Sequence, residues 1–339
     1  MKKILVTGGT GYIGSHTVVE LQQSGYEIII IDNLSNSNIE VLDGIVAITD
    51  KKPHFYQADC LDKNALHKIF SEHREICGII HFAASKAVSE SVSQPLLYYR
   101  NNLVSLLNLL ELMPQYGVES FVFSSSCTVY GQPSSEHLPV TENSPIQKAL
   151  SPYGNTKQIC EEIIRDSIYA NNNLKSIILR YFNPIGAHKS ALIGELPIGV
   201  PQNLVPFLTQ TAAGIRKELS VFGNDYDTPD GSCIRDYISV VDLAKAHVVA
   251  IERMLNNKQK SALEYFNIGT GRGLSVLELI EKFEQATGVK VPHRIAPRRE
   301  GDIEKVWADP TLANTELGWM AQETIEDTLC SAWEWQRRL

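Results

Sequence analysis

The run VTGGTGYIG, which places Gly8, Gly11 and Gly14 at intervals of three, constrains the fold of this chain more than any other feature. It follows a short apolar segment and precedes a segment of helical periodicity. Glycines at this spacing allow a tight turn, close approach of a pyrophosphate to the backbone, and close packing of helix on strand. The free N–H groups at the helix start then face the phosphates. The run predicts a strand–turn–helix unit that binds a dinucleotide, whereas a glycine motif alone would indicate only a tight turn.

A second apolar segment ends at Asp32, close to the distance of about 20 residues at which a carboxylate binds the adenosine ribose. No basic residue follows until Lys51, so no cation is near to accept a 2′-phosphate. We therefore expect NAD rather than NADP. Asp59 and Cys60 follow the third apolar segment and could flank the adenine, although an isolated Asp at a strand end is more often a turn residue.

Short apolar segments alternate with helical segments over the first 180 residues, and this alternation predicts a parallel sheet with right-handed crossovers and helices on both faces. The predicted strands are 4–6, 28–31, 55–57, 79–82, 121–124 and 176–179. The predicted helices include 14–23, 65–73 and 103–113. The fold class is α/β, a doubly wound parallel Rossmann sheet.

The chain has 339 residues, which is more than the ~250–300 at which single cores stop growing, so two domains are expected. Residues 1–180 would form the NAD-binding Rossmann domain. Beyond them prolines break the pattern into shorter pieces, and residues 181–339 would mainly form a smaller C-terminal substrate-binding domain. Segments near 234–240 and 265–268 could return to the first sheet.

Charge and composition exclude several classes of function. The net charge of −8 argues against a nucleic-acid partner, which would need a basic face. No apolar run reaches the ~18 residues that span a bilayer, and the first residues lack the apolar stretch of a secretion signal, so a cytoplasmic protein without a membrane partner is expected. The six cysteines and nine histidines show no ligand spacing, so no bound metal is expected. Leucines in 103–113 point in almost every direction, which favours a homodimer.

The stretch SPYGNTK places Tyr153 and Lys157 about one helical turn apart on one face. Ser151 can cap the helix, and Pro152 suits its first position. Such a pair is often an ordinary solvated helix face. A cation can also lower the pKa of a phenol, which is ordinarily near ~10, toward the range of a general base. The stretch alone leaves both interpretations open.

The glycine turn and the Tyr153/Lys157 pair together resemble the short-chain dehydrogenase/reductase superfamily in its extended branch. The resemblance then becomes specific over essentially the whole chain. The segments GGTGYIGSHT, DNLSNS, HFAASKAVSESV, FSSSCTVYG, SPYGNTK, LRYFNPIGAH, VFGNDYDTPDGSCIRDYI and APRREGD occur in the order and spacing of the UDP-glucose 4-epimerase family. That resemblance implies an isomerase of carbohydrate and galactose metabolism. It would interconvert UDP-galactose and UDP-glucose through NAD-dependent oxidation to a 4-keto sugar, rotation and re-reduction.

The resemblance also implies roles for individual residues. Tyr153 would be the general base, Lys157 would lower its pKa and hold the nicotinamide ribose, and Ser126 would bind the sugar 4′-hydroxyl. The residues expected to bind NAD are Gly8, Gly11, Tyr12, Ile13, Gly14, Asp32, Asn33, Asp59, Cys60, Phe82, Ala83, Ala84, Lys86, Asn101, Tyr153, Lys157 and Tyr181. Those expected to bind the UDP-hexose are Lys86, Ser126, Tyr153, Asn183, Asn203, Leu204, Ser220, Phe222, Arg235, Tyr237, Arg299, Asp302 and Val306. Arginines suit a diphosphate because their forked donors match its oxygens, although surface solvation is the commoner role of an arginine.

Two other functions are compatible with a chain of this fold. A nucleotide-sugar 4,6-dehydratase shares the fold and the first oxidation, but it usually carries an Asp-Glu pair just past the active-site hydroxyl, where this chain has Cys127-Thr128. A non-catalytic NAD-sensing module would have no reason to keep the Tyr/Lys pair with the arginines. Within the family, Val306 occupies a position where some members carry tyrosine and others cysteine. The smaller side chain suggests that UDP-GlcNAc and UDP-GalNAc are accepted as well, unless valine merely fills the same wall.

Overall fold

The computed structural model describes residues 2–299 and 302–339, and its central layer is a seven-stranded sheet in the order β10-β6-β5-β4-β1-β2-β3. Every neighbouring pair in this sheet is parallel. Its strands are β1 (Lys3–Thr7), β2 (Glu27–Asp32), β3 (His54–Gln57), β4 (Ile76–His81), β5 (Ser120–Ser124), β6 (Lys175–Tyr181) and β10 (Leu263–Ile268). The predicted parallel Rossmann sheet is confirmed.

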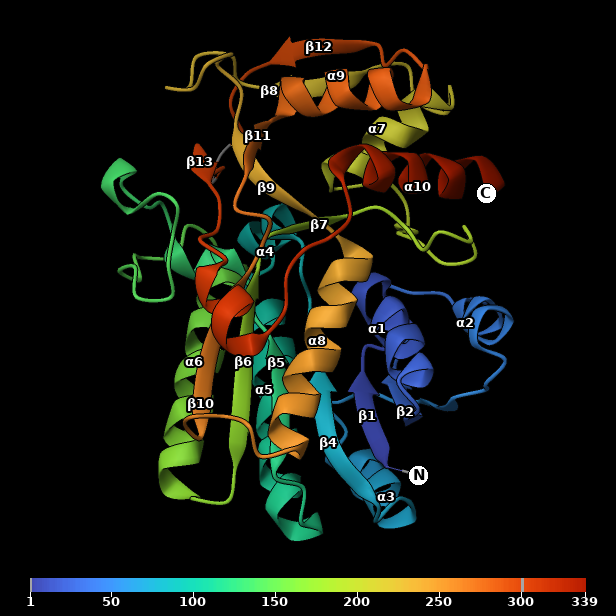
Figure 1. Cartoon of the computed structure of the whole chain (residues 1–339), viewed down its shortest axis with the longest axis vertical. Coiled ribbons are helices and arrows are strands. Elements are labelled where there is room, and N and C mark those ends of the chain that lie inside the picture. The colour runs from blue at the N-terminus through green and yellow to red at the C-terminus, as the bar shows by residue number, and fades with distance from the viewer. Residues whose placement is uncertain (1, 300–301) are drawn as a thin grey trace.

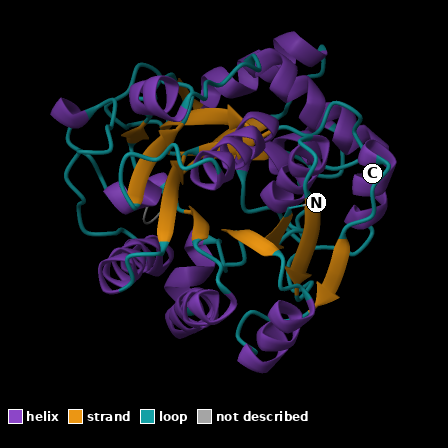
Figure 2. Cartoon of the chain, turned by 60° about the horizontal axis from the view of Figure 1, so that its bottom comes forward, coloured by secondary structure: helices purple, strands orange, loops and turns teal. Residues whose placement is uncertain are grey.

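Helices cover both faces of this sheet, as Figure 1 and Figure 2 show. One apolar core joins alternate strand residues to α1 (Tyr12–Gln23), α2 (Val41–Thr49) and α8 (Val240–Leu255). The core on the opposite face joins the remaining strand residues to α3 (Lys63–Glu72), α5 (Pro95–Leu112) and α6 (Pro152–Ala170). The strand run 28–31 is buried on both faces, with Ile28 and Ile30 in the first core and Ile29 and Ile31 in the second, which explains its unbroken apolar sequence.

A smaller set of elements lies beyond the carboxyl ends of the central strands, at the top of Figure 1. Its strands form a four-stranded sheet and a two-stranded sheet. The first contains β7 (Asn183–Ile185), β9 (Ile234–Ser239), β11 (Gly273–Ser275) and β13 (Lys305–Val306), and the second contains β8 (Leu219–Phe222) and β12 (His293–Ala296). Helices α7 (Leu204–Ala212), α9 (Val276–Thr287) and α10 (Ile325–Arg338) share a third apolar core with these strands.

The second half of the chain contributes to both layers. The segment that includes 265–268 is β10, and it forms one edge of the seven-stranded sheet beside β6. The segment near 234–240 instead forms β9, which pairs with β7, β11 and β13 in the smaller sheet. The chain then returns through α8 to the face of the Rossmann sheet. The domain boundary at residue 180 stays a prediction.

Two short features position the site described below. Helix α4 (Val88–Ser93) precedes α5, and a single 3₁₀ turn at Cys127–Tyr130 follows β5. Helix α6 begins as its sequence predicts, because the Ser151 hydroxyl accepts a hydrogen bond from the Gly154 N–H at 3.1 Å and Pro152 is the first helical residue. None of the helices within the described ranges is both long and apolar enough to cross a membrane.

Candidate active site

The glycine turn connects β1 to α1 at the carboxyl edge of the central sheet. Gly8 has a φ of +70°, and a Cβ there would lie 2.9 Å from the Ala83 backbone nitrogen. At Gly14 a Cβ would lie only 2.1 Å from the Gly8 carbonyl oxygen. The turn therefore has room for backbone only, which leaves its outer side open to a phosphate as the sequence predicts.

Asp32 ends β2 beside this turn and is 9% exposed. One carboxylate oxygen accepts from the Thr10 N–H at 3.2 Å, and the other accepts from the Leu34 N–H at 2.9 Å and the Ser37 hydroxyl at 3.1 Å. A carboxylate held in this way next to a phosphate-binding turn fits the diol of an adenosine ribose, and it would repel a 2′-phosphate.

The residues expected around the adenine lie close to Asp32 along the same edge. The Asn33 side-chain amide donates to Asp59 at 2.9 Å, and the other Asp59 oxygen accepts from the Leu61 N–H at 2.8 Å. Asp59 thus makes the turn contact that is usual for an Asp at a strand end, and it also accepts a hydrogen bond from the Asn33 side chain. Burial raises the pKa of the neighbouring Cys60 thiol to about 12, so this cysteine is an uncharged packing group.

The predicted catalytic residues converge at the carboxyl end of β5. Tyr153 is 7% exposed and Lys157 is 4% exposed on the inner face of α6. The Lys157 ammonium donates to the Ser124 carbonyl oxygen at 2.8 Å and lies 5.9 Å from the centre of the Tyr153 ring. The Ser126 hydroxyl accepts from the Thr128 N–H at 3.2 Å, and it acts to lower the pKa of the Tyr153 phenol. The Tyr/Lys pair is therefore a buried constellation and not a solvated helix face.

The electrostatics of this constellation correct one expectation from the sequence. The sequence predicts that Lys157 lowers the pKa of Tyr153, but burial raises that pKa well above its ordinary value, with Tyr181 adding to the rise. The Ser126 hydroxyl opposes the rise. Burial also lowers the pKa of Lys157 to about 8, which means that burial disfavours the charged form of this lysine. The phenol is protonated until further positive charge enters the site.

The remaining residues expected at the cofactor surround the same edge of the sheet. The Ala83 N–H donates to the Thr7 hydroxyl at 3.3 Å, which ties the segment after β4 to β1. The Asn101 amide donates to Ser85 at 3.0 Å, and the Ser124 hydroxyl donates to the Tyr181 hydroxyl at 3.1 Å. Phe82, Ala84 and Ile13 belong to the same segments and are partly buried.

Two cofactor-side residues also contact the segment between β7 and α7. The Tyr12 hydroxyl donates to the Gly186 carbonyl at 2.6 Å. The Lys86 ammonium lies 3.9 Å from the Glu195 carboxylate, which also accepts from the Asn203 amide at 2.6 Å. Lys86 and Asn203, both expected at the substrate, are thus joined by one carboxylate.

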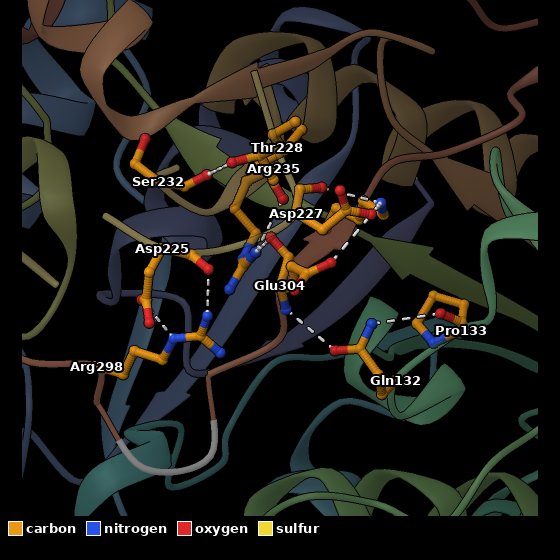
Figure 3. A network of polar contacts seen from close by, with 11 residues as sticks. Gln132, Pro133, Asp225, Asp227, Thr228, Ser232, Arg235, Arg298 and Glu304 are labelled. Atoms are coloured by element: carbon orange, nitrogen blue, oxygen red, sulfur yellow. Dashed lines mark hydrogen bonds and ion pairs between the residues drawn. The ribbon is translucent and has the colours of Figure 1, made fainter. Parts of the chain in front are cut away.

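The other residues expected at the UDP-sugar belong to the smaller sheets and the segments next to them. Arg235 lies on β9, and its guanidinium donates to the carbonyls of Ile234 at 2.8 Å and Glu304 at 3.4 Å (Figure 3). Arg299 makes a forked contact with Asp302 at 2.7 and 3.1 Å and lies 5.5 Å from the centre of the Phe222 ring. The other members of this set are Asn183 on β7, Leu204 at the start of α7, Ser220 on β8, Tyr237 on β9 and Val306 on β13.

Gln132, just past the 3₁₀ turn that follows Ser126, connects this substrate side to the catalytic side. Its side-chain amide oxygen accepts from the Glu304 N–H at 3.0 Å (Figure 3). Val306 pairs in register with Arg235 and is fully buried in an apolar cluster with Cys127 and Phe182. The segment that carries Arg299, Asp302 and Val306 is thereby placed against the segment that carries Ser126.

Three comparisons with known proteins agree with this geometry. A family model described as GDP-mannose 4,6 dehydratase matches residues 5–331. The chain is 53% identical over 333 residues to the UDP-glucose 4-epimerase of Bacillus subtilis, which covers 98% of this chain and 96% of that protein. The chain belongs to the UDP-glucose 4-epimerase family. This family lies within the extended short-chain dehydrogenase/reductase superfamily, to which the matched family model also belongs.

Solved structures support the same assignment. The UDP-glucose 4-epimerase of Bifidobacterium longum, in complex with NAD+ and UDP, is 46% identical with a TM-score of 0.95 over 99% of this chain and 98% of that chain. The UDP-Glc/GlcNAc 4-epimerase of Campylobacter jejuni is 36% identical with a TM-score of 0.84 over the full length of both chains. The matched family model has a dehydratase name, but the residues after Ser126 are a buried cysteine and a threonine, neither of which is the carboxylic acid that elimination usually needs.

Proposed function

We propose that this protein interconverts UDP-galactose and UDP-glucose by NAD-dependent epimerisation at C4 of the sugar. The observation that carries the proposal is the placement of Tyr153, Lys157 and Ser126 between a dinucleotide-binding edge and the arginine-bearing strands. The UDP-glucose 4-epimerase family, to which the chain belongs, includes the Bifidobacterium longum enzyme crystallised with NAD+ and UDP. A dehydratase would need this combination and, in addition, a carboxylic acid just past the active-site hydroxyl, where this chain has Cys127-Thr128. An NAD-sensing module would not need the combination.

The residues present fit NAD, because the glycine turn leaves space only for backbone beside a phosphate and Asp32 is fixed next to it. Gly8, Gly11 and Gly14 would hold the pyrophosphate, Asp32 the adenosine ribose, and Lys157 the nicotinamide ribose. When bound, this cofactor supplies reversible oxidation of the sugar hydroxyl to a ketone, and its oxidised ring adds positive charge beside the phenol.

Tyr153 would then act as the proton acceptor for the 4′-hydroxyl. Burial raises the pKa of the phenol, so positive charge around it is needed to make it basic. Lys157 provides one such charge, and the Ser124 carbonyl fixes its position. Ser126 would accept or donate a hydrogen bond at the same sugar oxygen. When the ketone is reduced again, Tyr153 returns the proton.

Epimerisation also requires that UDP stays bound while the keto-hexose rotates to present its opposite face. Arg235 and Arg299 belong to the smaller sheet and its loops, where forked donors can bind two phosphates. Cys127, next to Ser126, belongs with Phe182 and Val306 to an apolar cluster of buried side chains without strong hydrogen-bonding groups. We infer that this cluster forms part of the wall around the sugar. Such a wall offers few hydrogen bonds that would fix one orientation of the ketose, so it favours rotation between oxidation and reduction.

The deciding experiment follows UDP-galactose and UDP-glucose by chromatography after incubation with the purified protein, without added NADH. We expect both sugars to reach one equilibrium ratio from either direction. Formation of a 4-keto-6-deoxy sugar would indicate the dehydratase instead. Tight NAD binding with no turnover of either sugar would indicate the NAD-sensing module.

We also propose that UDP-GlcNAc and UDP-GalNAc are substrates. A valine at position 306 leaves more room at the C2 substituent than a tyrosine, and it is fully buried in the wall described above. The Campylobacter jejuni relative is titled a UDP-Glc/GlcNAc 4-epimerase. Val306→Tyr is expected to lower kcat/KM for UDP-GalNAc by roughly 10- to 200-fold more than for UDP-galactose, because the added ring takes the space of the acetamido group.

Val306→Cys is the matched control, since it keeps a small side chain and should process both sugars. Wild-type protein that converts UDP-galactose but shows no turnover of UDP-GalNAc would refute the broader specificity.

We further propose a homodimer formed through the α5–α6 face. Leu96 is 80% exposed and Tyr169 is 91% exposed on these helices, and Leu97 and Leu107 are also exposed. Leu96 and Leu97 lie in the first turn of α5 and Tyr169 in the last turn of α6, so exposed apolar side chains occur along these adjoining helices and favour a covered surface. A monomeric mass by light scattering at micromolar concentration would contradict this assembly.

A further inference from the structure

Helix α6, which carries Tyr153 and Lys157, has a third buried polar residue one turn further along the same face, Glu161. These three residues are spaced four apart and all face inward, and Glu161 is 6% exposed. A carboxylate buried this deeply needs hydrogen-bond and charge partners, and its surroundings show what it holds in place.

Glu161 has two hydrogen-bond partners, Ser125 in the segment after β5 and Arg180 on β6. The Ser125 hydroxyl donates to one carboxylate oxygen at 2.6 Å. Arg180 on β6 donates to the same oxygen at 3.1 Å and to the other oxygen at 2.7 Å. Arg180 is 5% exposed, and its guanidinium lies 5.1 Å from the ring centre of Tyr130 and 4.7 Å from that of Tyr265.

This pair is tied to several other elements. Arg180 also donates to the Tyr130 hydroxyl at 3.1 Å, and that hydroxyl donates to the Asn267 side chain at 2.6 Å. The Asn267 N–H in turn donates to the Glu142 carboxylate at 2.6 Å. Helix α6, strands β6 and β10, and the segments after β5 therefore meet at one fully bonded polar network.

The network acts on the catalytic serines through Ser125. Its hydroxyl is held by Glu161 and its N–H donates to the Leu179 carbonyl at 2.9 Å, so both its side chain and its backbone are fixed. The residue before it supplies the carbonyl that holds the Lys157 ammonium, and the residue after it carries the hydroxyl next to Tyr153. Movement of Ser125 would displace both contacts.

Glu161 also places a negative charge one helical turn from Lys157. The groups around Lys157 are the Ser124 carbonyl, the Phe123 ring at 4.8 Å, Tyr153, Cys160, Glu161 and the buried His81. Burial lowers the pKa of Lys157, and Cys160 and Glu161 oppose that effect. His81 has a pKa of about 3 and is therefore neutral at ordinary pH, and Cys160 is a thiol whose pKa burial raises. Glu161 is thus the acidic side chain available to keep the ammonium charged.

We propose that Glu161, locked in place by Arg180, is a positioning residue for the reaction: it fixes the Ser124–Ser126 turn through Ser125 and keeps a negative charge beside the Lys157 ammonium. The inference rests on the epimerase activity proposed above. A purely structural ion pair would stabilise the fold without affecting Lys157, so the test must separate the two.

Glu161→Gln is the primary variant, and Glu264→Gln is its matched control. Glu264 pairs with Arg253 through two contacts of 2.7 and 2.9 Å, and both side chains of that pair are 9% exposed. That pair joins β10 to α8 and has no contact with the active-site serines among the hydrogen bonds of the described residues. Both variants leave a buried arginine unpaired, so a similar loss of Tm is expected from each.

We expect Glu161→Gln to lower kcat by roughly 10- to 100-fold, with KM for UDP-galactose nearly unchanged. In the plot of kcat against pH, the fall in rate on the alkaline side (the alkaline limb) should begin roughly one pH unit lower, because Lys157 would lose its proton at a lower pH. Glu161→Asp, which keeps the charge, should retain the wild-type limb. Glu264→Gln should retain both the rate and the limb. A wild-type limb in Glu161→Gln, or an equal change of the limb in Glu264→Gln, would overturn the proposal.

A second readout does not depend on epimerase activity. NMR titration of isotope-labelled lysine, with Lys157 assigned by its loss in Lys157→Met, should show wild-type Lys157 titrating near pH 8 and Glu161→Gln titrating lower. An unshifted lysine would refute the inference even in a protein that lacks epimerase activity. If Glu161→Gln does not fold, the double variant Glu161→Gln/Arg180→Met removes both charges and should show a smaller lowering of the Lys157 titration, because loss of the Arg180 cation acts in the opposite direction.

Discussion

Tyr153→Phe is expected to slow the interconversion of UDP-galactose and UDP-glucose by orders of magnitude while NAD stays bound. The substitution removes one hydroxyl from a ring that is already 7% exposed, so packing around α6 should persist. Lys157 keeps its hydrogen bond to the Ser124 carbonyl, which does not involve the phenol. Proton transfer by a positioned side chain contributes roughly 10²- to 10⁴-fold, and we expect a loss of kcat in this range.

The measurement is kcat for both directions by chromatography, together with the NAD content of the purified variant. Tyr56→Phe is a suitable control. Tyr56 lies on the edge strand β3, away from the glycine turn and α6, and its hydroxyl donates to Glu72 at 2.8 Å. That variant should keep the wild-type rate. If Tyr153→Phe retained most of its activity, another group would have to accept the proton, and the assignment of Tyr153 as the base would be wrong.

The central sheet could be predicted from the sequence because burial on both faces leaves a readable pattern. All six predicted strands appear as β1 to β6, with bounds that differ by no more than a few residues. The smaller sheet is different. Its strand β13 has two residues, and β7 and β11 have three each, so none is long enough to show periodicity. The pairing of β9 with these short strands depends on contacts between distant parts of the chain.

The candidate site was predictable where chemistry depends on residue type and spacing. The glycine turn, Asp32 and the Tyr153/Lys157 pair all lie where those patterns indicate. The direction of the Tyr153 pKa was not predictable, because it depends on burial that the sequence does not show. The support from Ser124 comes from a backbone carbonyl, which any residue would provide.

Glu161 and Arg180 were missed for a related reason. A single carboxylate on a helix and a single arginine near a strand end usually lie at the surface, and only the fold brings these two together. The available signal was the spacing of four residues that continues from Tyr153 through Lys157 to Glu161. That signal gains meaning only when this face of the helix is known to be buried.

Gly14→Ala is expected to have the largest effect on cofactor binding among substitutions outside the catalytic residues. The added Cβ would lie 2.1 Å from the Gly8 carbonyl oxygen and 2.9 Å from the Gly8 carbonyl carbon and the Gly9 Cα. All three are backbone atoms of the turn itself, so no side chain can rotate away. Forcing extra atoms into a packed site costs about 1–3 kcal/mol, and the turn must open to accept them.

The opened turn would no longer present its N–H groups to the pyrophosphate. We expect a loss of NAD affinity of roughly 100-fold or more together with lower stability, since every ~1.4 kcal/mol of lost interaction weakens binding tenfold. Calorimetric titration of NAD into the cofactor-stripped protein and denaturant unfolding would measure the two effects.

Gly154→Ala provides the matched control for this substitution. Its Cβ would lie 3.4 Å from Ala149 and Thr128, an ordinary contact distance, and it would replace glycine inside helix α6. There alanine should stabilise the helix by up to about 1 kcal/mol and leave NAD affinity unchanged. Equal NAD affinity in Gly14→Ala and Gly154→Ala would mean that the phosphates do not bind at this turn, and the cofactor site would have to lie elsewhere on the sheet.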